Sequence, residues 1–94
     1  MKKDIPPLKV GTGWINMAVT GEATVVQTFK GYAPVIPVKV IATGLDYILY
    51  ISAKSLAEKL EPLRQANGGR FNGLRISIRK SSDEAFSPYE VKAL

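Results

Sequence analysis

Residues 45–80, LDYILYISAKSLAEKLEPLRQANGGRFNGLRISIRK, decide the fold that we expect for this chain. Residues 45–51 are a β-type run in which Tyr47, Leu49 and Ile51 share one face. Residues 55–66 have apolar residues at helical spacing, and residues 74–79 alternate apolar and basic side chains. The stretch therefore predicts a strand, a helix and a second strand.

The expected helix has a start signal, an apolar stripe and one awkward residue. Ser55 and Glu58 have the spacing of a capping box, in which each side chain bonds the other residue's backbone N–H. Pro62 cannot donate a backbone hydrogen bond, so the helix either kinks near Glu61 or restarts with Pro62 in its first turn. The stripe that would face the core consists of Leu56, Leu60 and Leu63.

The rest of the chain reads as further strands. Residues 8–20 predict a first strand, and residues 23–30 and 35–43 predict the two arms of a hairpin. In a five-stranded fold, residues 23–43 would form a bent second strand or two short ones. Pro37 has no N–H for a ladder, so it favours a sheet edge or a bulge. In the basic strand, Leu74, Ile76 and Ile78 are expected to face the core, with Arg75, Ser77 and Arg79 outside. Residues 89–93 alternate again and predict a last strand.

This order predicts a mainly β fold: a five-stranded OB-fold-like Greek-key barrel with one helix between the third and fourth strands. We expect residues 1–7 to be a flexible arm and residues 8–94 to be one domain. Residues 47–52, the capped helix and residues 75–80 and 89–92 resemble small single-stranded-DNA-binding proteins of the OB type from phages and archaea. The resemblance implies that nucleic acid binds across the second and third strands and two adjoining loops.

Composition excludes several classes of function. The chain has no cysteine and no histidine, so it lacks disulfides, thiolate nucleophiles, imidazole bases and the usual zinc ligands. No apolar run is long enough to span a membrane, and a cytoplasmic location is expected. The net charge of +5 favours polyanionic partners. Gly11-Thr12-Gly13 and the Ser77/Lys80 pair lack the context of known catalytic motifs, so we expect neither catalysis nor a cofactor or metal.

Single-strand binders combine cations for phosphates with exposed aromatic rings for bases. Residues 70–80 contain four cations and no acid. Trp14 is the leading stacking candidate, because its neighbours Asn16 and Thr20 on the same strand face are polar. The candidate nucleic-acid-binding residues are Trp14, Tyr32, Lys39, Arg70, Phe71, Arg75, Arg79, Lys80 and Phe86.

Each of these assignments has a simpler alternative. The aromatic residues can instead belong to the core. Arg75 and Arg79 can lie on a solvated face and pair with Glu90 or Asp83. The whole chain can instead be a protein-interaction or structural module, a possible homodimer that associates through an exposed strand edge near residues 34–37. A third alternative is a binder of duplex nucleic acid, which would share the basic strand.

Overall fold

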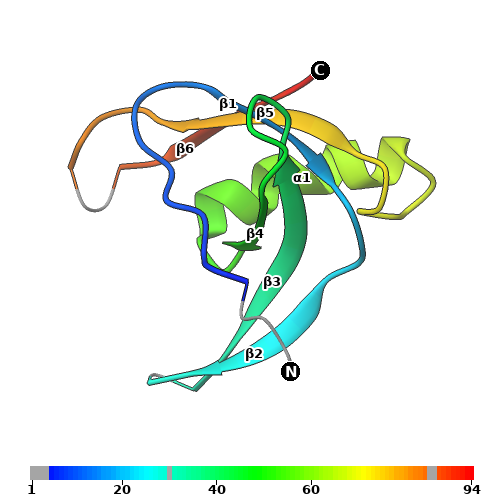
Figure 1. Cartoon of the computed structure of the whole chain (residues 1–94), viewed down its shortest axis with the longest axis horizontal. Helices are drawn as coiled ribbons and strands as arrows, with labels where there is room; N and C mark the ends of the chain where they lie inside the picture. Colours follow the sequence, from blue (N-terminus) through cyan, green and yellow to red (C-terminus); the bar gives the residue numbers. More distant parts are fainter. Residues whose placement is uncertain (1–4, 30, 85–86) are drawn as a thin grey trace.

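Over the residues that the computed structural model describes, 5–29, 31–84 and 87–94, the chain forms one antiparallel sheet and one helix (Figure 1). The helix, α1, spans Lys54–Ala66 and follows the fourth strand. The six strands are β1 (Ile15–Val19), β2 (Thr24–Thr28), β3 (Gly31–Val40), β4 (Asp46–Tyr50), β5 (Arg75–Lys80) and β6 (Tyr89–Ala93). The predictions of a mainly β fold and of a helix in residues 55–66 are confirmed.

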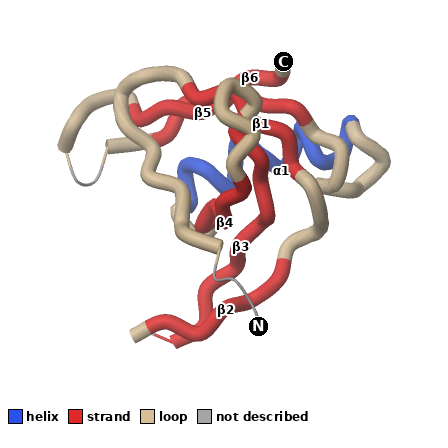
Figure 2. The backbone as a smooth tube through the Cα atoms, in the orientation of Figure 1, coloured by secondary structure: helices blue, strands red, loops and turns tan. Residues whose placement is uncertain are grey.

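The strand order is β2-β3-β1-β5-β6, and β4 pairs with the second edge of β3. β3 therefore lies at the centre: β2 and β1 pair with successive parts of one edge, and β4 with the other. In Figure 2, β1, β5 and β6 lie together at one end, and the β2–β3 hairpin reaches away at the other. β4 and β6 do not pair within the described residues, so the sheet is open. The predicted count of five strands is wrong, because residues 23–43 form two separate strands.

A bulge lies where β1 passes into β2. Val19 pairs with Val38 and Thr24 with Val35, so residues 20–23 stand opposite only residues 36–37. Pro37 lies at this interruption, where no interstrand hydrogen bond requires the backbone N–H that proline lacks. The bulge interpretation of Pro37 is confirmed. The edge interpretation is wrong, as is the exposed edge expected near residues 34–37, because β3 is paired along both edges there.

The segment before β1 is tied to the sheet at two points. Pro6 and Leu8 bond the backbone of Ile48 in β4, at 3.0 and 2.8 Å, and Gly11 accepts a 2.8 Å bond from the Lys80 N–H at the end of β5. The first strand is shorter than the predicted residues 8–20, because only Ile15–Val19 joins the ladders. The sequence predicts a loose arm over residues 1–7, whereas residues 6–7 are bonded to β4; residues 1–4 lie outside the described residues.

The core lies between one face of the sheet and α1. The two helix leucines at its centre, Leu56 and Leu60, are buried, and Leu63 packs at its margin, as the apolar stripe predicted. The buried strand residues that meet the helix leucines are Met17, Val19, Ile36, Val38, Leu49, Ile76 and Ile78, with Leu74 just before β5. All of these strand residues lie on the sheet face that we call the core face.

The predicted capping box is wrong. The helix begins after Ala53, which has an extended backbone and makes no side-chain cap bond. The Ser55 hydroxyl instead accepts a 3.3 Å hydrogen bond from the Tyr89 N–H, and Glu58 pairs with Lys54 at 3.8 Å. A second contact, from the Lys59 ammonium to the Tyr89 carbonyl, also joins the helix to β6. The first strand residue of β6 thus takes the hydroxyl that the box would have used.

Pro62 lies inside a helix that runs on to Ala66, so the predicted restart at Pro62 is wrong. Because proline in a helix interior costs about 3 kcal/mol and restricts the unfolded chain by about 1 kcal/mol, we expect Pro62→Ala to raise the free energy of unfolding by about 1–2 kcal/mol. Denaturant unfolding measures the change. Pro88→Ala, in an exposed loop, is the control and should lower stability slightly. An unchanged or lowered stability in Pro62→Ala would show that this helix accommodates proline without cost.

Hydrogen bonds to Glu22 connect the bulge with the loop between α1 and β5. Its carboxylate accepts hydrogen bonds from the backbone N–H groups of Phe71 and Asn72, at 3.1 and 2.9 Å. These bonds, together with the more distant charges of Arg70 and Arg64, hold the pKa of Glu22 below its usual value of 4.5. Arg64 and Gln65 similarly lower the pKa of Glu61 to about 2.

Both carboxylates are expected to make stability fall in acid. A carboxyl whose folded-state pKa is lowered stabilises the fold above its unfolded pKa, and loses that contribution as the pH falls through the folded value. The loss should therefore begin near pH 4.5 and continue toward pH 2. We expect Glu22→Gln to unfold at a lower temperature at neutral pH and to lose less stability between those pH values than the wild type. Thermal unfolding from pH 7 to pH 2 tests this, with exposed Glu84→Gln as the control; parallel curves would contradict it.

The single described helix is too short and too polar to cross a membrane.

Candidate nucleic-acid interface

The sheet face opposite the core, here called the outer face, collects the basic side chains of several strands. Residues paired across strands share a face, and Ile76 and Ile78 of β5 point into the core. The residues between and beside them therefore point outward. Pairing then assigns to the outer face Asn16 and Ala18 of β1, Lys39 of β3, Arg75, Ser77 and Arg79 of β5, and Glu90 and Lys92 of β6.

Trp14 precedes β1 and lies beside two cations. The Arg79 guanidinium carbon is 4.6 Å from the centre of the indole ring, and the Lys92 ammonium is 4.5 Å from it. β1 and β6 are two strand spacings apart, about 10 Å, so the Trp14 and Lys92 side chains must approach each other over β5. Trp14 as a whole is still 39% exposed. We call Trp14, Arg79, Glu90 and Lys92 the Trp14 cluster.

The two cations of this cluster differ in their partners. Arg79 donates a 2.7 Å hydrogen bond to the carboxylate of Glu90, which stands directly opposite it on β6. The simpler alternative of a salt bridge to Glu90 is therefore confirmed for Arg79. Lys92 makes no ion pair with any described residue, so its charge is available to an anionic ligand.

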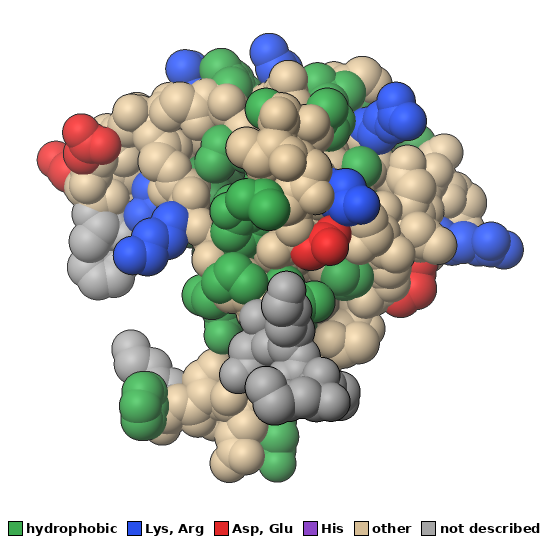
Figure 3. Space-filling view, in the orientation of Figure 1, with side chains coloured by type: hydrophobic (Ala, Val, Ile, Leu, Met, Phe, Trp, Pro, Cys, Tyr) green, Lys and Arg blue, Asp and Glu red, His purple; other side chains and the backbone are tan. Residues whose placement is uncertain are grey.

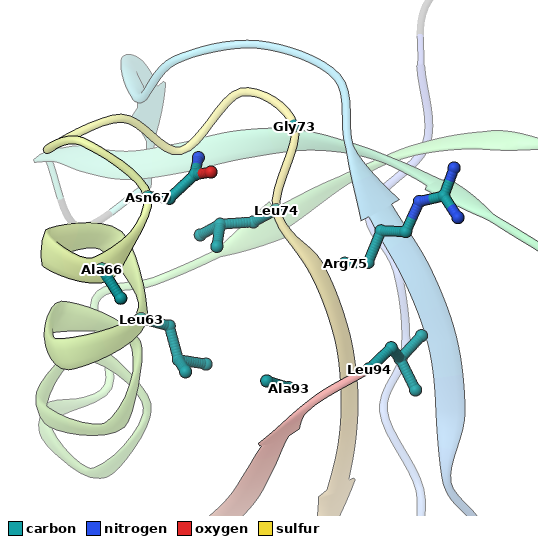
Figure 4. A pocket seen from close by; sticks show the side chains of 8 residues that line it. All are labelled: Leu63, Ala66, Asn67, Gly73, Leu74, Arg75, Ala93 and Leu94. Carbon is teal, nitrogen blue, oxygen red and sulfur yellow. The ribbon is translucent and has the colours of Figure 1, made fainter.

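Arg75 and Lys39 extend the basic surface across the sheet. Ala18 pairs with Lys39 on one side and with Arg75 on the other, so their backbones lie about 10 Å apart. Neither has an ion pair with a described carboxylate, although Asp46 stands opposite Lys39 on β4. In Figure 4 the Arg75 side chain points away from Leu63 and Leu74 and toward β1. Arg75 and Arg79 are about 13 Å apart along β5.

Ser77 lies on the outer face, as predicted, but it is fully buried. It stands between Asn16 and Lys92 in the register, and both of these residues have longer side chains. Its hydroxyl has no hydrogen-bond partner among the described residues. A buried hydroxyl without a hydrogen-bond partner costs about 1–3 kcal/mol of folding free energy. The fold therefore tolerates this cost at Ser77, beneath the basic surface.

The remaining candidates do not join this surface. Tyr32 is exposed on the β2–β3 hairpin, and Arg70 is exposed in the loop after α1. Lys80 is on the opposite face of β5, where its ammonium lies 5.9 Å from the ring centre of Tyr89. Phe71 is half-buried and packs against the core, 5.8 Å from the Arg64 guanidinium. Phe86 lies outside the described residues.

Lys92 was missed as a candidate. The alternation of residues 89–93 already places Glu90 and Lys92 on one face of the last strand. The alternation does not reveal how β6 pairs with β5. That pairing sets Lys92 opposite Ser77 and brings the Lys92 ammonium to the Trp14 ring. Sequence alone therefore found the aromatic residue of the cluster and one of its two cations.

Hollows also lie on the surface of the part of the chain that the structure describes. Between the tip of the β2–β3 hairpin and the loop that joins β5 to β6, Figure 3 shows a concave region, and a shallow pocket of about 450 Å³ is lined by Gln27, Thr28, Phe29 and Tyr50. A second pocket of about 320 Å³ lies between the end of α1 and the start of β5 (Figure 4). Leucine and alanine side chains dominate its lining. Neither pocket brings together acids, bases or nucleophiles.

No group of acidic side chains within residues 5–29, 31–84 and 87–94 is arranged to hold a metal ion. Comparison with protein-family models, with curated proteins and with solved structures gives no match for this chain. Function must therefore be inferred from the outer face and its side chains.

Proposed function

We propose that the protein binds single-stranded nucleic acid through its outer face and does no chemistry on it. The observation that carries this proposal is the Trp14 cluster, in which a part-exposed indole lies within 5 Å of two cations. Stacking of a base on an aromatic side chain contributes about 1–3 kcal/mol, and nearby cations neutralise the flanking phosphates. The cluster offers both interactions at one place.

The charges around the cluster support an extended ligand. Three cations of the outer face make no ion pair with a described carboxylate: Lys39, Arg75 and Lys92. The backbone of each lies about 10 Å or less from the backbone of another of the three. An extended strand can bring successive phosphates to such positions. The β2–β3 hairpin is the one described element that protrudes like the ribbon that can enter a duplex groove, and the sequence has only one charged residue, Lys30, between residues 23 and 38. The basic outer face with its indole therefore suits flexible single strands better than a duplex.

We also propose that the fold is an open relative of the OB fold. β1, β3 and β4 pair in sequence, α1 follows, and β5 and β6 return to the free edge of β1. With β2 set aside as an added hairpin strand, this connectivity supports a relation to the five-stranded Greek-key barrel. Residues 6–8 bond the edge of β4 that β3 leaves free, and Gly11 bonds the end of β5.

Titration of the intrinsic fluorescence tests the proposal directly, because Trp14 is the only tryptophan. Oligo-dT at low salt should quench the emission, and added salt should reverse the quenching. Single-stranded RNA and duplex DNA are compared in the same assay. Absence of both quenching and salt-sensitive binding would refute the proposal, and a preference for duplex would favour the alternative of a double-strand binder.

The salt dependence gives a prediction for a single residue. Each phosphate neutralised on a single strand contributes about 0.7 to the slope of log affinity against log salt. Arg75→Gln should therefore reduce the slope by about 0.7. Arg70→Gln removes the same charge from an exposed position away from the outer face and should leave the slope unchanged. Equal slopes for the two variants would mean that Arg75 does not contact phosphate.

A further inference from the structure

The open edge of β2 carries unused backbone hydrogen-bonding groups. β2 ends the sheet, and no described strand pairs with its second edge. Pro34 of β3 pairs with Val25 of β2, and the Pro34 carbonyl accepts a 3.1 Å bond from the Ile51 N–H on the other side. In an antiparallel ladder, both backbone groups of one residue point to the same side. Pro34 therefore faces away from β2, and the N–H and C=O of Val25 face the open edge.

The same alternation applies two residues along. Gln27 pairs with Tyr32 as Val25 pairs with Pro34, so the backbone groups of Gln27 also face outward. The open edge thus presents two donors and two acceptors, centred on Val26. If a second copy pairs antiparallel about a twofold axis through Val26, Val25 of each copy stands opposite Gln27 of the other. In that register the N–H and C=O groups of Val25 and Gln27 on each strand all find hydrogen-bond partners.

The surroundings of this edge favour a second copy over nucleic acid. From residue 23 to residue 38 the sequence contains one charged residue, Lys30. Phosphates would therefore find little countercharge along β2, whereas two chains of net charge +5 can approach here without bringing cations together. The side chains are also apolar for an exposed surface: Val25 is 64% exposed, Tyr32 is 77% exposed and Phe29 is fully exposed.

We infer that the protein forms a homodimer in which the β2 strands of two copies pair antiparallel about Val26 and join the two sheets into one. An uncharged, exposed edge strand is the usual template for such pairing, because nothing repels an incoming strand. The Trp14 cluster lies at the other end of the sheet, near β5 and β6, and is left uncovered. The inference does not depend on nucleic-acid binding.

Two double variants and the wild type test the inference by sedimentation equilibrium over a range of concentrations, without nucleic acid. The wild type should approach twice the monomer mass as its concentration rises. Val25→Lys/Gln27→Lys sets like charges opposite one another across the twofold axis and should stay monomeric. Val25→Glu/Gln27→Lys sets opposite charges face to face and should dimerise at least as well as the wild type.

Both positions are exposed, and circular dichroism with thermal unfolding establishes that the variants are folded. A wild type that stays monomeric at every concentration would overturn the inference, and so would a dimer that survives in Val25→Lys/Gln27→Lys. A monomeric Val25→Glu/Gln27→Lys variant would overturn the register about Val26. Trp14 quenching by oligo-dT, measured on the same samples, reports the proposed function separately, so that failure of either idea can be recognised.

Discussion

Replacement of Leu60 by alanine is expected to lower the free energy of unfolding by about 2–5 kcal/mol. Leu60 is 1% exposed and lies in the centre of α1, between Leu56 and the core face of the sheet. Removal of its side chain loses buried apolar surface and leaves a cavity. The helix cannot close this cavity, because the Tyr89 N–H donates to the Ser55 hydroxyl and the Lys59 ammonium donates to the Tyr89 carbonyl, and these bonds hold α1 on β6. A domain of this length has a total stability of about 5–14 kcal/mol, so the variant should be close to unfolding.

Urea or guanidinium unfolding measures this effect as a lower midpoint with an unchanged slope. Leu45→Ala is the matched control, because Leu45 is the same residue type but 55% exposed. We expect the control to change the free energy of unfolding by less than about 0.5 kcal/mol. If both variants were equally stable, α1 would contribute little to the core, despite the burial of Leu56 and Leu60.

Replacement of Trp14 by alanine is expected to weaken single-strand binding by about 1–3 kcal/mol, which is roughly 5- to 150-fold in affinity. The variant loses the stacking surface and also the ring beside which the Arg79 and Lys92 charges lie. Trp14→Phe keeps an aromatic face and should recover most of the affinity. Because neither variant retains tryptophan, anisotropy of a labelled oligonucleotide provides the measurement.

Tyr32→Ala is the control for the loss of an exposed aromatic residue. Tyr32 lies on the β2–β3 hairpin, outside the Trp14 cluster, and its removal should leave the affinity unchanged. A larger loss with Tyr32→Ala than with Trp14→Ala would move the proposed binding surface from the outer face to the hairpin. Equal affinities for the wild type and all three variants would argue against stacking altogether.

Local patterns in the sequence predicted those features that depend only on the spacing of side chains within one element. The period-2 run in residues 45–51, the leucine stripe of the helix and the apolar positions of β5 all lie where expected. Failures arose where distant partners intervened. Tyr89 takes the hydroxyl of Ser55 from the capping box, and neighbouring strands bury Ser77 on a face that its own strand marks as exposed.

The candidate site shows the same division. Trp14, Arg75 and Arg79 could be assigned to an outward face from alternation alone, and Lys39 joins them through the β1–β3 register. Neither charge nor expected exposure distinguished Lys80 from Arg79 as a candidate binding residue, although adjacent residues of a strand point to opposite faces of the sheet. Lys92 joins the cluster only because β6 pairs with β5 in one particular register, which depends on the whole sheet.

The position of β1 in the sheet has a consequence for how quickly the protein reaches its native state. β2, β3 and β4 are joined by short turns, whereas β1 pairs with β5 across about sixty residues of chain. Closing so long a loop is costly in entropy, and domains rich in such distant pairings fold in milliseconds to seconds. The three-stranded meander can form early, and the docking of β5 and β6 onto β1 completes the fold. Because that last step also brings Arg79 and Lys92 to Trp14, stopped-flow tryptophan emission should report the slow phase.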